Sequence, residues 1–210
     1  MSVKVKICGI TNAPDAIAAA EAGADVVGFV FHEQSPRFVS IEAAAEITRD
    51  LPPHLLKAGV FVNAPEDFVA RAIQQCGLNL LQFHGDETPD YCIQFGPLSI
   101  KAFRIRNGDS LEALKDFKTE AFLLDAYSPS QRGGTGEIFN WKLAVEAQKF
   151  GRPIFLAGGL RPENVAEAVR QVRPYGVDVS SGVEKAPRMK DHGKIKAFLE
   201  AAKAASLDKS

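Results

Sequence analysis

The sequence predicts an α/β fold: a single-domain (β/α)8 TIM barrel with eight parallel strands, spanning residues 1–210. Eight short apolar segments recur along the chain, and the stretches between them space their apolar residues as an amphipathic helix does. Strands that alternate with helices form a parallel sheet whose crossovers are covered by helices. Eight such units in a chain of 210 residues favour closure into a barrel. An open, Rossmann-like sheet is the alternative.

Each expected strand is an apolar run that ends near Gly, Asp, Asn or Ser, the residue types that favour turns. The eight runs are residues 3–8, 26–31, 56–62, 78–83, 100–103, 121–125, 154–157 and 177–180. None approaches the roughly 20 apolar residues that are needed to cross a bilayer.

The helical spacing is clearest in four of the connecting segments. Its apolar positions are Ala13, Ala16, Ile17 and Ala20; Val69, Ala72, Ile73 and Cys76; Val165, Ala168, Val169 and Val172; and Ile195, Phe198, Leu199 and Ala202. Proline favours the first helical turn, where no backbone N–H is needed, and a polar side chain favours the N-cap. The residues that fit these positions are Pro14, Pro65, Pro89 and Pro162, with Asn140 as the N-cap before Trp141.

Composition limits the class of partner and the compartment. Lys and Arg number 25 against 26 Asp and Glu, and there is no dense basic run, so we expect no nucleic-acid and no membrane partner. Lys4 and Lys6 interrupt the apolar stretch that a signal peptide would need. The three cysteines form no CxxC pair and the four histidines lack ligand spacing, which argues against disulfides and a metal site. We therefore expect a cytoplasmic protein.

The first and sixth expected strands end in residues suited to acid–base chemistry, at the carboxyl ends where such barrels build their active sites. Side-chain alternation places Lys6 and Cys8 inside the barrel, with Cys8 at the mouth, and Asp125 faces inward by the same parity. The structural alternative for Cys8 is a small buried hydrophobe, which is what we expect of Cys76 and Cys92. For Asp125 it is a turn cap. If Asp125 is catalytic, its apolar surroundings would raise its pKa and favour the protonated acid.

Glycine-bearing turns close the seventh and eighth strands. Glycine lets backbone N–H groups approach an oxyanion, and these two adjacent strands are where barrels commonly bind phosphate. One such turn would be a weak signal, whereas two on neighbouring strands predict a phosphate site. Its residues are Gly158 and Gly159 in one turn, and Ser180, Ser181 and Gly182 in the other.

Two loops at the same face have both a structural and a functional interpretation. The segment 128–136 is either a flexible connector or a mobile loop that closes over the site and excludes water. Its glycine-rich part is Gly133, Gly134, Thr135 and Gly136. Arg37, which follows the second strand, is either solvated in a surface turn or a contact for substrate.

Motifs along essentially the whole chain, in the right order, resemble those of phosphoribosylanthranilate isomerase of tryptophan biosynthesis. They are Lys6-Ile7-Cys8-Gly9-Ile10-Thr11, Ser35-Pro36-Arg37, Gln82-Phe83-His84-Gly85, Leu124-Asp125, Gly133-Gly134-Thr135-Gly136 with Phe139 and Trp141, Leu156-Ala157-Gly158-Gly159-Leu160, and Val177-Asp178-Val179-Ser180-Ser181-Gly182-Val183-Glu184. Each motif alone is weak, but the ordered set is specific. The resemblance implies an Amadori rearrangement of N-(5-phosphoribosyl)anthranilate to 1-(2-carboxyphenylamino)-1-deoxyribulose 5-phosphate, with this small molecule as the partner.

The resemblance also implies a role for each site residue. Asp125 is the general acid that protonates the ring oxygen, and Cys8 is the general base that removes the proton from sugar C2. Arg37 holds the anthranilate carboxylate, for which a guanidinium is well suited. The two glycine-bearing turns hold the phosphate. The remaining substrate contacts are Gln82, His84 and Asp178, of which the last contacts the sugar or orients its neighbours.

The chemistry needs no cofactor, because the protonated imine of the intermediate is itself the electron sink. It does need Cys8 as a thiolate, and at an ordinary pKa near 8.5 only about 3% of a thiol is ionised at neutral pH, a penalty of roughly 2 kcal/mol. A nearby positive charge would reduce that penalty. Lys6 and Lys101 are the two inward-facing candidates.

Two other classes of function remain as alternatives. One is another phosphate-binding barrel enzyme, of the indole-glycerol phosphate synthase or pentose-phosphate epimerase type. Those enzymes need catalytic Lys and Glu residues, or metal-ligand His and Asp, at the strand ends, where this sequence offers Cys8 and Asp125. The other is a catalytically silent barrel that serves as a scaffold. Both a monomer and a homodimer are compatible with the sequence.

Overall fold

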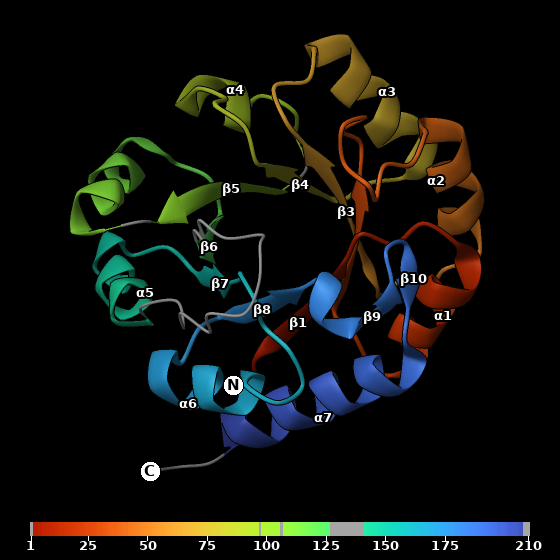
Figure 1. The fold of residues 1–210 in the computed structure, drawn as a ribbon. Coiled ribbons are helices and arrows are strands. Elements are labelled where there is room, and N and C mark those ends of the chain that lie inside the picture. The colour runs from red at the N-terminus through yellow and green to blue at the C-terminus, as the bar shows by residue number, and fades with distance from the viewer. Residues whose placement is uncertain (1, 97, 106, 127–140, 208–210) are drawn as a thin grey trace.

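The structure, a computed structural model, describes residues 2–96, 98–105, 107–126 and 141–207. Eight parallel strands pair in sequence order, and β8 pairs with β1, so the sheet is a closed barrel inside a ring of helices (Figure 1). This confirms the predicted fold class. The strands are β1 (Lys4–Cys8), β2 (Val26–Val30), β3 (Leu56–Phe61), β4 (Leu80–Phe83), β5 (Leu98–Ile105), β6 (Ala121–Ala126), β7 (Ile154–Leu156) and β8 (Gly176–Val179).

All eight predicted strands are present, and each of their ends lies within two residues of the expected one. The largest difference is β5, which was expected to span only residues 100–103. Its register with both neighbours continues further, from Leu98 opposite Leu80 to Ile105 opposite Ala126. The polar residues Ser99 and Arg104 interrupt the apolar pattern there, so the sequence pattern predicted too short a strand.

The connecting segments form α1 (Ala13–Glu21), α2 (Ile41–Arg49), α3 (Glu66–Cys76), α4 (Pro89–Ile93), α5 (Trp141–Ala147), α6 (Val165–Val172) and α7 (His192–Leu207), with 3-10 helices η1 (Gly108–Asp116), η2 (Gln148–Phe150) and η3 (Ser181–Val183). The expectation of an α-helix after every strand is wrong for the fifth unit, where η1 covers the sheet instead. Among the described residues, no helix combines the length and apolar character needed to cross a membrane.

Only some of the residues that were expected at the starts of helices lie there. Pro14 and Pro89 lie in the first turns of α1 and α4, as predicted. Pro65, by contrast, is the N-cap of α3, and Pro162 precedes α6, whose N-cap is Asn164. Asn140, the expected N-cap before α5, lies outside the described residues.

Two apolar layers surround the sheet and fix which side chains face inward. One fills the barrel interior and includes Leu80, Leu123 and Phe155. The other lies between the sheet and the helices and includes Val5 and Ile7 of β1. Since successive residues of a strand point to opposite faces, Lys6 and Cys8 point inward, as predicted.

A short antiparallel hairpin that the sequence did not predict follows β8 and η3. It consists of β9 (Glu184–Ala186) and β10 (Met189–Lys190). The backbone N–H of Lys190 donates to the Asp15 carboxylate on α1 at 2.9 Å, and His192 at the start of α7 lies 2.9 Å from the other Asp15 oxygen. Asp15 therefore joins the first helix to the last segments of the barrel, and α7 lies beside α1 in Figure 1.

Candidate active site

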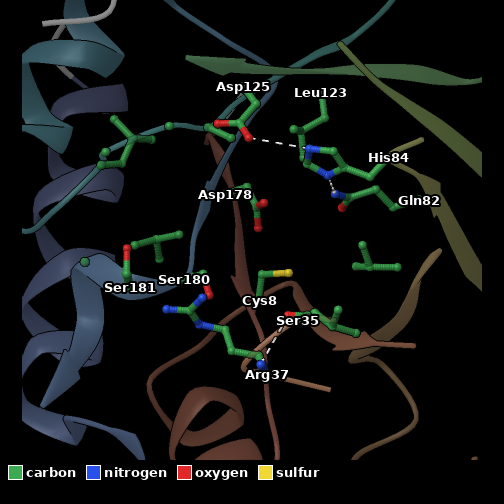
Figure 2. Close-up of a pocket in the computed structure, with 18 of the residues that line it drawn as sticks. Cys8, Ser35, Arg37, Gln82, His84, Leu123, Asp125, Asp178, Ser180 and Ser181 are labelled. Atoms are coloured by element: carbon green, nitrogen blue, oxygen red, sulfur yellow. Dashed lines mark hydrogen bonds and ion pairs between the residues drawn. The ribbon is translucent and has the colours of Figure 1, made fainter. Parts of the chain in front are cut away.

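A cavity of about 440 Å³ opens at the carboxyl ends of the strands (Figure 2). Every candidate catalytic, substrate-binding or phosphate-binding residue named from the sequence lines it: Cys8, Arg37, Gln82, His84, Asp125, Gly158, Gly159, Asp178, Ser180, Ser181 and Gly182. The loop residues Gly133, Gly134, Thr135 and Gly136 lie outside the described residues. The structure thus brings together candidate residues from six of the eight strands and the loops that follow them.

Cys8 lies at the floor of the cavity, at the end of β1, and is 7% exposed. Burial raises the pKa of its thiol, the charge of Lys6 lowers it and the charge of Asp178 raises it, with a net value above the ordinary one. The expectation that Lys101 faces inward is wrong, because its neighbours Ile100 and Ala102 fill the barrel interior. Lys101 lies on the helix side of β5, where it forms an ion pair with Glu87 at 2.8 Å. Of the two lysines considered from the sequence, Lys6 is therefore the one whose charge acts on Cys8.

Asp125 lies at the end of β6, and Figure 2 shows it pointing toward His84, with Asp178 between it and Cys8 in this view. The His84 Nε2 atom is 3.5 Å from the Asp125 carboxylate, and the Asp125 side chain is 32% exposed. The expectation of apolar surroundings for Asp125 is therefore wrong, because a partly exposed polar neighbour stands beside it. Cys8 and Asp125 nevertheless border one common cavity, from strands on different sides of the barrel.

Gln82 orients the ring of His84. Its amide nitrogen lies 3.1 Å from His84 Nδ1, and since that nitrogen can only donate, Nδ1 accepts and a neutral ring carries its proton on Nε2, facing Asp125. Gln82 is almost fully buried, and its Oε1 has no hydrogen-bond partner among the described residues. An unsatisfied buried acceptor is costly, so this atom is suited to receive a donor from a bound molecule.

Arg37 does not lie in solvent but forms a two-pronged ion pair with Glu184. Its Nε and Nη2 donate to the two Glu184 oxygens at 2.8 and 2.6 Å. Lys190, which is fully buried, donates to Glu184 at 3.1 Å and to the Ser180 carbonyl at 3.0 Å. Hydrogen bonding to Glu184 raises the pKa of Arg37. Burial raises the pKa of Glu184, but Arg37 and Lys190 outweigh it and hold that pKa below its ordinary value.

The two glycine-bearing turns lie next to each other on β7 and β8. Gly158 and Gly159 have φ of 81° and 69°, a left-handed conformation that favours glycine. Gly182 packs so closely on the Leu160 carbonyl that a Cβ atom would collide with it. Both turns thus present backbone rather than bulky side chains to the cavity, as an anion site requires.

The sequence did not single out several of the lining residues. His32 is one, and an apolar wall formed by Val30, Val60, Val62 and Leu123 is another. The wall could have been predicted, because these residues lie in or directly after β2, β3 and β6 with inward parity. Within the described part of the chain, no group of three or more His, Cys, Asp or Glu side chains is arranged to hold a metal ion.

Comparison with known proteins gives one consistent result. A family model described as N-(5'phosphoribosyl)anthranilate (PRA) isomerase matches residues 5–201. A relative from Geobacter sp. (strain M21) named N-(5'-phosphoribosyl)anthranilate isomerase is 56% identical over 200 residues, which cover 95% of this chain and 98% of the relative.

Solved structures agree. The crystal structure of phosphoribosyl anthranilate isomerase from Thermotoga maritima matches with a TM-score of 0.89 at 43% identity, covering 96% of this chain and 99% of that one. A crystal structure of the isomerase in complex with reduced 1-(o-carboxyphenylamino)-1-deoxyribulose 5-phosphate matches with a TM-score of 0.86 at 41% identity, with the same coverage.

Proposed function

The chain belongs to the N-(5'-phosphoribosyl)anthranilate isomerase family, and from this premise we propose that it converts N-(5'-phosphoribosyl)anthranilate to 1-(2-carboxyphenylamino)-1-deoxyribulose 5-phosphate in tryptophan biosynthesis. The reaction makes it an aldose-ketose isomerase. The observation that carries the proposal is that a thiol, a carboxyl group and two glycine-bearing turns border one shared cavity. These are the base, the acid and the phosphate site that this isomerisation needs.

The proposed reaction begins at Asp125, which donates a proton to the furanose ring oxygen. The C1–O bond breaks and the nitrogen lone pair forms a protonated imine. The Cys8 thiolate then removes the proton from C2, and the electron pair of that C–H bond moves into the imine to give an enolamine. A proton then adds to C1 while the C2 hydroxyl loses its proton, which gives the ketone, so no electron sink beyond the substrate is required.

Binding of the substrate uses three parts of the cavity. Gly158, Gly159, Ser180, Ser181 and Gly182 hold the phosphate, and the apolar wall packs against the anthranilate ring. Because Arg37 already holds Glu184 through Nε and Nη2, its Nη1 is the nitrogen left to meet the anthranilate carboxylate. The buried Gln82 Oε1 accepts a sugar hydroxyl, with His84 and Asp178 beside it.

The test is turnover of freshly made phosphoribosylanthranilate, followed by the loss of its fluorescence. We expect Cys8→Ser and Asp125→Asn each to lower kcat by about a hundredfold or more, the usual contribution of a general acid or base, while the fold is retained. Cys76→Ser is the matched control, because that thiol is buried in α3, away from the cavity. Near-full turnover by either cavity variant would remove that residue from the mechanism.

Absence of turnover in the unaltered protein would favour the scaffold alternative. Turnover of another phosphorylated sugar, with none of phosphoribosylanthranilate, would favour another phosphate-binding barrel enzyme. We further propose that the chain is one domain and that it acts in the cytoplasm.

A further inference from the structure

A lysine lies fully buried beneath the proposed catalytic thiol, and the mechanism above does not use it. Lys6 precedes Cys8 by two residues on β1, so both side chains point into the barrel. Its Nζ forms an ion pair of 2.9 Å with Asp178, which lies directly opposite it on β8. Burial of two charges costs more than such a pair commonly returns in stability, so Lys6 calls for a role other than packing.

The side chains of Lys6 and Cys8 both lie next to Gly28 on β2. A Cβ atom at residue 28 would lie 2.9 Å from the Cys8 sulfur and 3.2 Å from both Nζ and Cε of Lys6. The missing side chain of Gly28 is what lets the ammonium and the sulfur meet there. Gly28 thus leaves room in the barrel interior for the Lys6 ammonium and the Cys8 sulfur to lie side by side.

Four charged groups act on the Cys8 sulfur from the elements around it. Lys6 on β1 and Lys190 on β10 favour the thiolate, Asp178 on β8 opposes it, and Arg37 lies close enough for its own pKa to respond to a Cys8 thiolate. Lys190 and Arg37 are both paired with Glu184. Lys6 has the largest favourable effect of these charges on Cys8.

We propose that Lys6 is a positioning residue for the isomerisation, which holds the Cys8 sulfur toward the cavity and stabilises its thiolate, while Asp178 keeps Lys6 in place. The inference rests on the proposed role of Cys8 as the base. Burial alone would lower the pKa of Lys6, but the charges of Asp178 and of Cys8 raise it above the ordinary value, so the lysine stays protonated where the enzyme works.

The test measures Cys8 itself rather than turnover. Iodoacetamide alkylates the thiolate and releases iodide, so its rate against pH follows ionisation. Labelling mapped by mass spectrometry separates Cys8 from Cys76 and Cys92, which are buried with pKa values raised to about 11 and about 12 and serve as silent internal controls. Labelling of either one would reveal unfolding.

The expected signs are opposite for the two members of the ion pair. Lys6→Met should slow alkylation of Cys8 at neutral pH by about tenfold or more and lower kcat in proportion, with KM little changed. Asp178→Asn should speed the alkylation, because it removes the charge that opposes ionisation. Lys6→Arg keeps the charge and should react nearly as the unaltered protein does.

The matched control is Lys101→Met, which breaks another buried lysine–carboxylate pair, on the helix side of β5 and away from Cys8. We expect no effect of that change on Cys8 alkylation.

An unchanged alkylation rate in Lys6→Met, or slower alkylation in both Lys6→Met and Asp178→Asn, would overturn the inference. If Lys6→Met does not fold, the double variant Lys6→Met/Asp178→Asn leaves no unpaired charge and should still react more slowly than Asp178→Asn alone. Absence of turnover in the unaltered protein would instead refute the proposed function. The alkylation rates would still test the effect of Lys6 on Cys8, because they do not depend on turnover.

Discussion

At the scale of single residues, Glu184 holds the guanidinium of Arg37 but has no role of its own in the proposed reaction. We expect Glu184→Gln to raise KM for phosphoribosylanthranilate about tenfold with kcat little changed, because the guanidinium loses the charged partner that fixes its direction. Steady-state kinetics of the purified variant measure the effect. Glu200→Gln, on the exposed face of α7, is the control and should change neither constant.

A fall in KM for Glu184→Gln would contradict this view of Glu184. It would show that the carboxylate competes with the substrate for Arg37 rather than orienting it.

The sequence located the candidate residues of the cavity better than it predicted their partners. Cys8 and Asp125 could be placed because both end apolar strands and strand parity directs their side chains. The pairing of Arg37 with Glu184 spans 147 positions, and no local pattern reports a contact of that separation. Parity failed for Lys101, because the run 100–103 has apolar residues on both faces, and the structure shows that Ile100 and Ala102 are the ones that face inward.

At the scale of elements, β2 carries a glycine whose lost side chain makes room for Lys6 and Cys8. We expect Gly28→Ala to destabilise the fold by about 1–3 kcal/mol, as overpacking of a core commonly does, and to lower kcat by moving the sulfur. Urea denaturation and turnover measure the two effects. Gly108→Ala, at the start of η1, is the control, because a Cβ atom there meets nothing within 4 Å.

Full activity and stability in Gly28→Ala would mean that the two side chains can move aside. In that case the absence of a side chain at Gly28 would not be needed to position Lys6 and Cys8.

Elements whose residues follow a simple period were predicted, and those that depart from it were not. The run from Val165 to Val172 became α6, since its apolar residues repeat at helical spacing. The η1 segment has only Leu111 and Leu114 buried, a spacing of three that a 3-10 helix also satisfies. The β9–β10 hairpin escaped prediction because its strands are too short for alternation to be visible.

At the scale of the whole molecule, Asp15 couples the first helix to the last hairpin, and its charge makes stability depend on pH. Burial alone would raise the pKa of Asp15, but the Lys190 N–H, His192 and Asn12 outweigh it and lower the pKa. A lowered folded-state pKa stabilises the fold above the unfolded value near 3.8, and this contribution is lost as pH falls below it.

We therefore expect the unaltered protein to lose more stability than Asp15→Asn between neutral pH and about pH 3. Denaturant midpoints of both proteins at each pH measure the difference, and the other carboxylates cancel in the comparison. Equal losses in the two proteins would show that Asp15 contributes nothing to the acid sensitivity.

The ion pair between Lys6 and Asp178 also constrains how the chain is made. Its two members are 172 positions apart, so a ribosome completes the lysine long before the aspartate exists. A nascent chain that closed early would bury an ammonium with no counterion, which is strongly unfavourable. We therefore expect a partly translated barrel to stay open, with closure only after the final strand has emerged.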